Sequence, residues 1–190
     1  MSKRSIHRSR MLLAAGAAAA MLPALTQAAT DPFFEYTDAA ALASAAPGTV
    51  LKSRTIAVYV AGFQTKLKAT QLVYRSTDAQ MRPAANVTTI FAPDCSSGCP
   101  NKNKVISYQS FYDSLNPEDS PSRAYAGGKR LPDLLPAVET ILFGKYVKQG
   151  YTVVVSDTEG QKANFAAGPE YGYNTIDSIR AAFNSPLIGL

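Results

Sequence analysis

The sequence is poor in histidine and cysteine. Its one histidine, His7, lies near the N-terminus, and its two cysteines are Cys95 and Cys99. Residues 8–190 therefore hold no histidine that could act as a catalytic base or bind a metal ion, and two cysteines are too few ligands for a structural zinc site. The sequence also contains no G-x-S-x-G, a turn that presents a nucleophilic serine for catalysis. We expect neither a metal nor a cofactor.

The first 28 residues have the features of a secretory signal peptide. A basic start precedes an apolar, alanine-rich run from Met11 to Leu25, and Thr26-Gln27-Ala28 provides the small residues of a cleavage site. The apolar run is too short for a comfortable membrane span. An uncleaved anchor is the alternative, but Pro23 interrupts the run. We therefore expect removal of residues 1–28, a domain at 29–190 that is exported to the periplasm or the medium, and no stable membrane span after cleavage.

The apparent basicity of the chain belongs mostly to this first segment. The whole sequence has 19 Lys and Arg against 14 Asp and Glu, which gives a net charge of +5. Four of the basic residues lie in the first 28, so 15 basic and 14 acidic residues remain and the net charge falls to +1. No basic patch remains that would indicate nucleic-acid binding. The four residues are Lys3, Arg4, Arg8 and Arg10.

The two cysteines are separated by three residues, in a C-x-x-x-C arrangement. In an exported protein the oxidising environment favours a local disulfide between Cys95 and Cys99. Two free thiols are the alternative. Closing such a short loop would stabilise the fold by about 2 kcal/mol in the chain-entropy model.

The first half of the exported chain predicts antiparallel strands. An alanine-rich segment at 38–46 favours a short helix. After it, β-branched or alternating runs are bounded by Gly, Pro and Asp, as is typical of strands joined by hairpins. These predicted strands are Thr49–Ser53, Ile56–Val60, Lys68–Thr77 and Asn86–Ala92.

The second half predicts a parallel crossover. Residues 105–108 favour a short strand in the interior of a sheet, and Tyr151–Ser156 is a β-branched run typical of a strand covered on both faces. Between them, residues 131–149 predict a helix, so that strand, helix and strand form one right-handed unit. One face of this helix is apolar and is expected to be buried: Leu134, Val138, Ile141 and Leu142.

A second helix is predicted from Gly168 to about Asn184. Its expected buried stripe is Ile176, Ile179 and Phe183. An ion pair between Asp177 and Arg180 is expected on its side.

Five segments, in this order and spacing, resemble the secretory lipase family of α/β-hydrolases, of the lipase A type. The resemblance covers nearly all of residues 31–190. It implies a partial α/β-hydrolase fold, with antiparallel strands leading into parallel βαβα units and truncated before the nucleophile elbow. It also implies hydrolysis of carboxylic esters of lipids, such as triacylglycerols, without a cofactor. The segments are Ala46–Leu51, Tyr74–Asp78, Ser107–Ser114, Val155–Gly160 and Gly172–Ala182.

In that family the nucleophilic serine follows the strand after the second helix, and the acid and the histidine come later in the chain. The present sequence contains neither the elbow motif nor a histidine after His7. A Ser-His-Asp triad therefore cannot be assembled from this chain alone.

The resemblance places an oxyanion-hole residue at Asp113, just after the strand at 105–108. An oxyanion hole needs hydrogen-bond donors, and an ionised carboxylate would repel the developing charge. Asp113 would therefore act through its backbone N–H, or through a side chain kept protonated by apolar surroundings. Tyr108, Phe111 and Tyr112 could provide those surroundings. The alternative is that Asp113 only shapes a turn.

Asp157 and Glu159 could suggest the paired carboxylates of a glycosidase. Because both follow the end of a strand, we interpret them instead as polar turn residues. Glu170 is likewise interpreted as an acidic residue in the first turn of a helix.

Two functional hypotheses follow. In the first, the chain is an incomplete product of a longer gene for an exported lipase or esterase that acts on a lipid or ester substrate. In the second, it is a truncated, non-catalytic α/β-hydrolase fragment that at most binds a lipid or a partner. The two differ in whether a strand, a G-x-S-x-G motif, an acid and a histidine follow in the reading frame.

Overall fold

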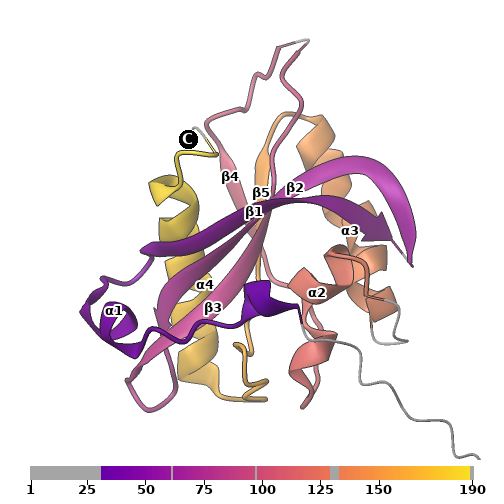
Figure 1. Ribbon diagram of the computed structural model, residues 1–190. Coiled ribbons are helices and arrows are strands. Elements are labelled where there is room, and N and C mark those ends of the chain that lie inside the picture. The colour runs from indigo at the N-terminus through magenta and orange to yellow at the C-terminus, as the bar shows by residue number, and fades with distance from the viewer. Residues whose placement is uncertain (1–30, 61, 97, 129–132, 189–190) are drawn as a thin grey trace, which may run out of the picture. The chain divides into compact units, whose positions relative to one another are not determined.

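The computed structural model describes residues 31–60, 62–96, 98–128 and 133–188. The predicted signal peptide lies outside these residues. Within them, one mixed sheet has the strand order β1-β2-β3-β5-β4 (Figure 1). The strands are β1 (Val50–Val60), β2 (Phe63–Thr77), β3 (Pro83–Phe91), β4 (Val105–Tyr108) and β5 (Thr152–Ser156). The helices are α1 (Ala39–Ser44), α2 (Pro121–Tyr125), α3 (Leu134–Lys148) and α4 (Gly168–Asn184), with short 3-10 turns η1 (Pro32–Phe34) and η2 (Pro117–Asp119).

The pairing confirms the predicted fold class. Strands β1, β2 and β3 are antiparallel neighbours, and β5 pairs antiparallel with β3. Strand β4 runs parallel to β5, and α3 connects the two as the predicted crossover. Antiparallel strands thus lead into a parallel βαβα unit. None of the helices in the described ranges is both long enough and apolar enough to cross a membrane.

Two strand predictions need correction. The segments predicted at 49–53 and 56–60 form one continuous strand, β1. Arg54 and Thr55, which separate them, contain no turn-forming residue and pair with Gln71 and Thr70 of β2. Strand β4 is only partly buried, not enclosed in the sheet interior. Among the described residues it has a strand neighbour on one side only, so its other edge is less covered.

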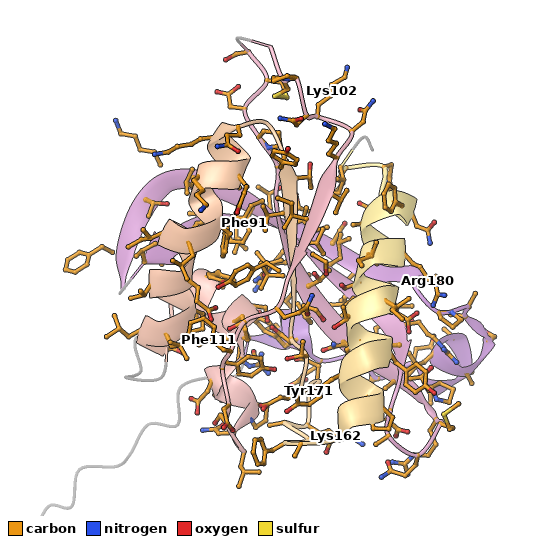
Figure 2. All side chains as sticks on the ribbon, turned by 180° about the vertical axis from the view of Figure 1, so that it is seen from behind. Phe91, Lys102, Phe111, Lys162, Tyr171 and Arg180 are labelled. Carbon is orange, nitrogen blue, oxygen red and sulfur yellow. A yellow bond between two sulfur atoms is a disulfide. The ribbon has the colours of Figure 1, made fainter. Side chains whose placement is uncertain are left out.

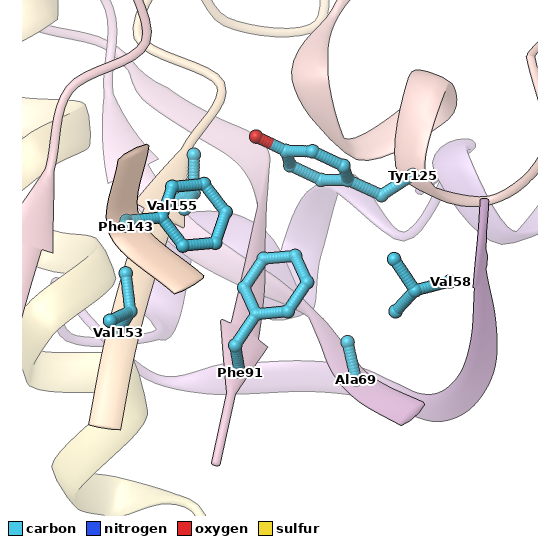
Figure 3. Packing of buried hydrophobic residues seen from close by; sticks show 7 residues of the cluster. All are labelled: Val58, Ala69, Phe91, Tyr125, Phe143, Val153 and Val155. Atoms are coloured by element: carbon cyan, nitrogen blue, oxygen red, sulfur yellow. The ribbon is translucent and has the colours of Figure 1, made fainter. Parts of the chain in front are cut away.

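Strand β5 divides the core into two layers, because its alternate side chains point to opposite faces of the sheet. Val153 and Val155 face α2 and α3, while Val154 faces α4, and all three are fully buried. This confirms the strand covered on both faces. Figure 3 shows the first layer, in which aromatic rings from β3, α2 and α3 meet. The seven buried residues of this layer are Val58, Ala69, Phe91, Tyr125, Phe143, Val153 and Val155.

Helix α3 packs through a different face from the predicted one. Its four predicted core residues do share a face, but that face is exposed, and the side chain of Ile141 is 72% accessible. The buried face carries Phe143 and Glu139 instead. The ring of Phe143 fills the space beside Phe91, with 5.0 Å between centroids (Figure 3). The orientation of α3 on the sheet therefore follows its one large aromatic contact and its buried carboxylate. It does not follow the face that carries the most aliphatic residues.

Helix α4 also packs through a different face from the predicted one. Of the predicted stripe, Ile176 and Phe183 are exposed and Ile179 is half-buried. The helix packs on the sheet mainly through small and polar side chains. Small residues allow the helix to approach the strands closely, where its own polar groups can bond to them. The hydroxyl of Tyr74 on β2 donates to the carbonyl oxygen of Asn174 at 2.7 Å. The buried residues are Glu170, which lies in the first turn as interpreted, Asn174, Asp177, Ser178, Ala181 and Ala182.

Two local predictions are confirmed. Cys95 and Cys99 form a disulfide, with 5.1 Å between their Cα atoms, in the loop between β3 and β4. Asp177 and Arg180 form the expected ion pair on α4, at 2.6 Å from Oδ1 to Nη1.

Candidate active site

The loop after β4 holds the predicted site residue, Asp113. Because β4 and β5 are parallel, their C-terminal ends meet at the same edge of the sheet, and the loops after them touch. Phe111 and Tyr171 lie toward this end of the molecule, and Lys102 lies at the opposite end (Figure 2). The side chain of Asp113 is exposed.

The backbone N–H groups of the residues on both sides of Asp113 are hydrogen-bonded to side-chain oxygens. The N–H of Phe111 donates to Oε1 of Glu139 at 2.9 Å, and the N–H of Ser114 donates to Oε2 of Glu159 at 3.3 Å. The N–H of Tyr112 donates to the hydroxyl of Ser110 at 3.3 Å. Within the part of the chain that the structure describes, the N–H of Asp113 has no acceptor. The loop therefore presents one unpaired donor between anchored neighbours.

Glu159 connects this loop to the end of β5 and to α4. Its Oε1 accepts a hydrogen bond from the hydroxyl of Tyr171 at 2.8 Å, and its N–H donates to the hydroxyl of Tyr112 at 3.0 Å. Burial raises the pKa of Glu159, and the charge of Asp113 raises it further. Burial also raises the pKa of Tyr171, to about 12, with a further contribution from its hydrogen bond to Glu159.

Asp157 anchors the next segment, helix α2. It is fully buried and accepts hydrogen bonds from the N–H of Ser122 at 3.0 Å and from the hydroxyl of the same residue. Gln161 donates to it at 3.1 Å. Burial raises the pKa of Asp157. Asp157 and Glu159 therefore do follow a strand, as interpreted, but both are buried. Asp157 fixes helix α2, and Glu159 fixes the loop after β4.

The geometry favours one of the two ways in which Asp113 could donate a hydrogen bond. A protonated side chain would need apolar enclosure, but Asp113 is exposed and the side chain of Phe111 is 61% accessible. Tyr112 is buried, and its hydroxyl is bonded to Glu159. Tyr108 belongs to β4 and packs on the core against Phe143, with 5.0 Å between centroids. The backbone N–H is the donor that fits these surroundings.

Asp113 lies between two depressions. One, of about 500 Å³, opens toward α3 and is lined by Tyr112, Asp113, Ser114, Asp119, Leu134, Leu135 and Val138. The other, of about 640 Å³, opens toward α4 and includes Phe111, Thr158, Phe165, Tyr171 and Ile176 in its lining. A substrate group placed at the Asp113 N–H could therefore extend to either side. Among the described residues, no group of three His, Cys, Asp or Glu is arranged to hold a metal ion.

Sequence reasoning missed Glu139, which lies on the buried face of α3 and holds the N–H of Phe111. Burial raises its pKa, against the opposing effect of nearby Ser110 and of the Phe111 N–H. No local pattern could have found it, because Glu139 lies 28 residues from the amide that it holds.

Glu139→Gln should make the stability of the protein less dependent on pH. Since the folded-state pKa of Glu139 is raised, this residue binds protons more tightly in the folded state, and its contribution to the free energy of unfolding falls as pH rises above the ordinary glutamate pKa. Glutamine keeps an oxygen for the Phe111 N–H and does not titrate. Urea unfolding between pH 4.5 and 8 should therefore show the variant gaining on the wild type as pH increases. A constant difference between the two would contradict the assignment.

The comparisons with known proteins relate this chain to lipases. A family model described as "Secretory lipase" matches residues 129–189. A probable inactive lipase of Mycobacterium tuberculosis is 35% identical over 164 residues, which are 84% of this chain and 35% of that protein. Lipase A of Moesziomyces aphidis is 36% identical over 156 residues, 81% of this chain and 32% of the relative.

Among solved structures, Candida antarctica lipase A in its closed state matches with a TM-score of 0.70 and 35% identity, over 82% of this chain and 35% of that one. Fold and comparisons together define a partial α/β-hydrolase. The resemblance to the secretory lipase family, of the lipase A type, is confirmed, and this chain is a relative of those proteins. It spans about a third of the length of the curated relatives that it matches.

Proposed function

We propose that this chain is part of an exported lipase or esterase that hydrolyses carboxylic esters of lipids, and that it supplies an oxyanion-hole donor, the backbone N–H of Asp113. The observation that carries the proposal is this N–H itself. It is the unpaired donor in a row of anchored amides, at the carboxyl end of a parallel strand. In open α/β sheets, ligand-binding and catalytic residues lie at that edge.

The proposed chemistry is acyl transfer. A serine oxygen attacks the ester carbonyl, a histidine takes the serine proton and later gives it to the leaving alcohol, and negative charge develops on the carbonyl oxygen. Donors that already point at that oxygen stabilise the transition state without reorganising. In this chain Glu139 and Glu159 hold the amides on both sides of Asp113, so the loop is ordered before substrate arrives. The serine, the acid and the histidine would come from residues outside this sequence.

The export part of the proposal rests on the first 28 residues. The gene product should be recovered from the medium or the periplasm with its N-terminus at or near Ala29. N-terminal sequencing and an intact mass of that material would show both the cleavage site and the length of the exported chain.

The same material tests the activity. An exported product that contains an elbow serine and a histidine should hydrolyse p-nitrophenyl esters, and residues 29–190 alone should not do so above a heat-killed control. Robust turnover by residues 29–190 after purification would require another nucleophile and would overturn the mechanism. An exported product that ends without a histidine and binds lipid without turnover would instead support the second hypothesis, a non-catalytic binding module.

A further inference from the structure

A depression of about 860 Å³ lies at the end of the molecule away from the loop after β4. Three segments that are far apart in the sequence form it: the start of β2, the loop between β3 and β4, and the end of α3. Figure 2 shows Lys102 of that loop at the opposite end of the molecule from Phe111 and Tyr171. The volume is within the usual range of binding sites for small molecules, about 300–1,000 Å³.

Six exposed lysines surround this depression. Three of them line it, and the other three lie within three positions of a lining residue. Among the residues that the structure describes, none of the six forms an ion pair with a carboxylate. The lysines that line the depression are Lys66, Lys68 and Lys148, and those beside it are Lys102, Lys104 and Lys145.

These lysines concentrate positive charge at one end of the molecule. Residues 63–68, 92–104 and 145–151 contain six lysines and one acidic residue, Asp94, which gives a net charge of +5. The rest of residues 29–190 contain nine basic and 13 acidic residues, a net charge of −4. No single run of the sequence shows the cluster, because the fold assembles it from three segments. A concentrated positive field of this kind attracts anions.

The walls of the depression are fastened to one another. A disulfide between Cys95 and Cys99 closes the loop that forms one wall. Asn101 joins this wall to α3, because its Nδ2 donates to the carbonyl oxygen of Gln149 at 2.9 Å. The loop also packs closely on Gly150, where a Cβ atom would lie 3.4 Å from the backbone nitrogen of Asn101. The lysines are therefore held around a space of defined shape.

Local roles account for single lysines but not for the group. Lys145 and Lys148 lie in the last turn of α3, where positive charge stabilises the helix dipole. Lys66 and Lys68 precede Thr70, the first residue of β2 that pairs with β3, and lysine on an unpaired strand edge discourages aggregation. Neither role requires lysines from three segments to meet at one depression. Like charges brought together repel one another, and a bound anion would compensate them.

The lining of the depression favours one class of anion. Lysine binds phosphate oxygens as a point charge. Among the described residues that line the depression, none is aromatic, so the bases of a nucleic acid would have no ring on which to stack. Leu67 is the one large apolar side chain of the lining that is exposed, which is little for insertion into a membrane surface. Several cations around one depression fit a single chain that carries several phosphate groups.

We propose that this depression binds a phosphate polyanion, with successive phosphate groups of the chain at Lys66, Lys68 and Lys148. The site goes beyond the proposed function, because it requires neither ester hydrolysis nor Asp113. In an exported protein it would attach the molecule to a phosphate polymer and leave the loop after β4 at the far end.

The binding test compares long-chain polyphosphate with orthophosphate on the exported protein, by isothermal titration calorimetry at neutral pH and low salt. Polyphosphate should bind at least about 10²-fold more tightly, because one chain engages several lysines at once. With three lysines in contact, the logarithm of the affinity should fall with the logarithm of the salt concentration, with a slope of about −2 to −3. No binding, or an affinity no higher than that of orthophosphate, would overturn the proposal.

Two charge reversals locate the site. Lys148→Glu places a negative charge in the lining and should weaken polyphosphate binding by about tenfold or more. Lys162→Glu changes the net charge of the protein by the same amount at the other end of the molecule (Figure 2), and solvent screening should keep its effect below about twofold. Thermal unfolding checks that both variants are folded. Equal effects of the two reversals would show that net charge alone drives binding.

Removal of the disulfide tests whether the depression itself is the site. Replacing both cysteines, Cys95→Ser and Cys99→Ser, leaves every charge in place but frees one wall. Polyphosphate binding should weaken at least about threefold, because the lysines are no longer held in position before the ligand arrives. Unchanged binding would show that the lysines act as separate surface charges and would refute the site.

Two further probes test the class of ligand. Phosphatidylglycerol vesicles and an oligothymidylate, each at the same phosphate concentration as polyphosphate, should bind less tightly than polyphosphate does. Tighter binding of the vesicles would assign the lysines to a membrane surface, and tighter binding of the oligothymidylate would assign them to nucleic acid. Either result would overturn the proposal.

Discussion

Phe143→Ala should lower the free energy of unfolding by about 3–5 kcal/mol, the range expected for removing a buried phenylalanine ring. The side chain of Phe143 is 1% accessible. Its ring lies 5.0 Å from those of Phe91 and Tyr108 and 6.3 Å from that of Tyr125, measured between centroids. Truncation would leave a cavity among three rings that other elements of the core hold in place.

Ile141→Ala is the matched control for this prediction. Ile141 lies two residues before Phe143 on the same helix, but it is 72% accessible. Its truncation should change the free energy of unfolding by no more than about 0.5 kcal/mol, as is usual for exposed positions. Urea denaturation of both variants measures the two values. A loss at Ile141 equal to or larger than the loss at Phe143 would mean that α3 packs through the face that the sequence suggested.

The strands could be predicted from the sequence, but the face through which α3 packs could not. Strand positions were predictable because β-branched runs such as Val153–Val155 carry their own signal, and the crossover followed from strand, helix and strand. The orientation of α3 was not predictable, because leucine, isoleucine and valine outnumber Phe143 on the helix surface. Periodicity identifies a shared face, but it does not say whether the sheet or a ligand covers it.

The buried face of helix α4 was not predictable for the opposite reason. Its buried stripe contains Ala181, Ala182 and Asp177, which carry little apolar area and therefore gave no signal. Their value lies in contacts with β2, a strand about a hundred residues earlier: the hydroxyl of Ser76 donates to Oδ2 of Asp177 at 3.2 Å. Such a pairing exists only once the sheet has brought the two segments together.

The candidate site also has one part that could be predicted from the sequence and one part that could not. The place of Asp113 was predictable, since it follows a parallel strand and the resemblance marks that position. The two carboxylates that hold its neighbours were not, because Glu139 and Glu159 lie 28 and 45 residues from the amides they accept from. Long-range hydrogen bonds of this kind leave no local pattern in a sequence.

Asp113→Pro should slow acylation by about 10²–10³-fold in an exported enzyme that carries the remaining catalytic residues, the cost of removing one oxyanion donor. Proline has no N–H and therefore removes the donor itself. Asp113→Ala keeps the N–H and removes only the exposed carboxylate, so its rate should stay close to that of the wild type. If the donor were the protonated side chain, Asp113→Ala would be slowed as well. Thermal unfolding of both variants checks that the loop change leaves the fold intact.

The most direct test of the account is therefore the rate of the first, acylation burst with a p-nitrophenyl ester, measured by stopped flow on wild type, Asp113→Ala and Asp113→Pro. A backbone donor at Asp113 predicts a burst that is nearly unchanged in Asp113→Ala and about 10²–10³-fold slower in Asp113→Pro. Bursts of equal rate in all three proteins would contradict the central claim and leave Asp113 as a turn residue only.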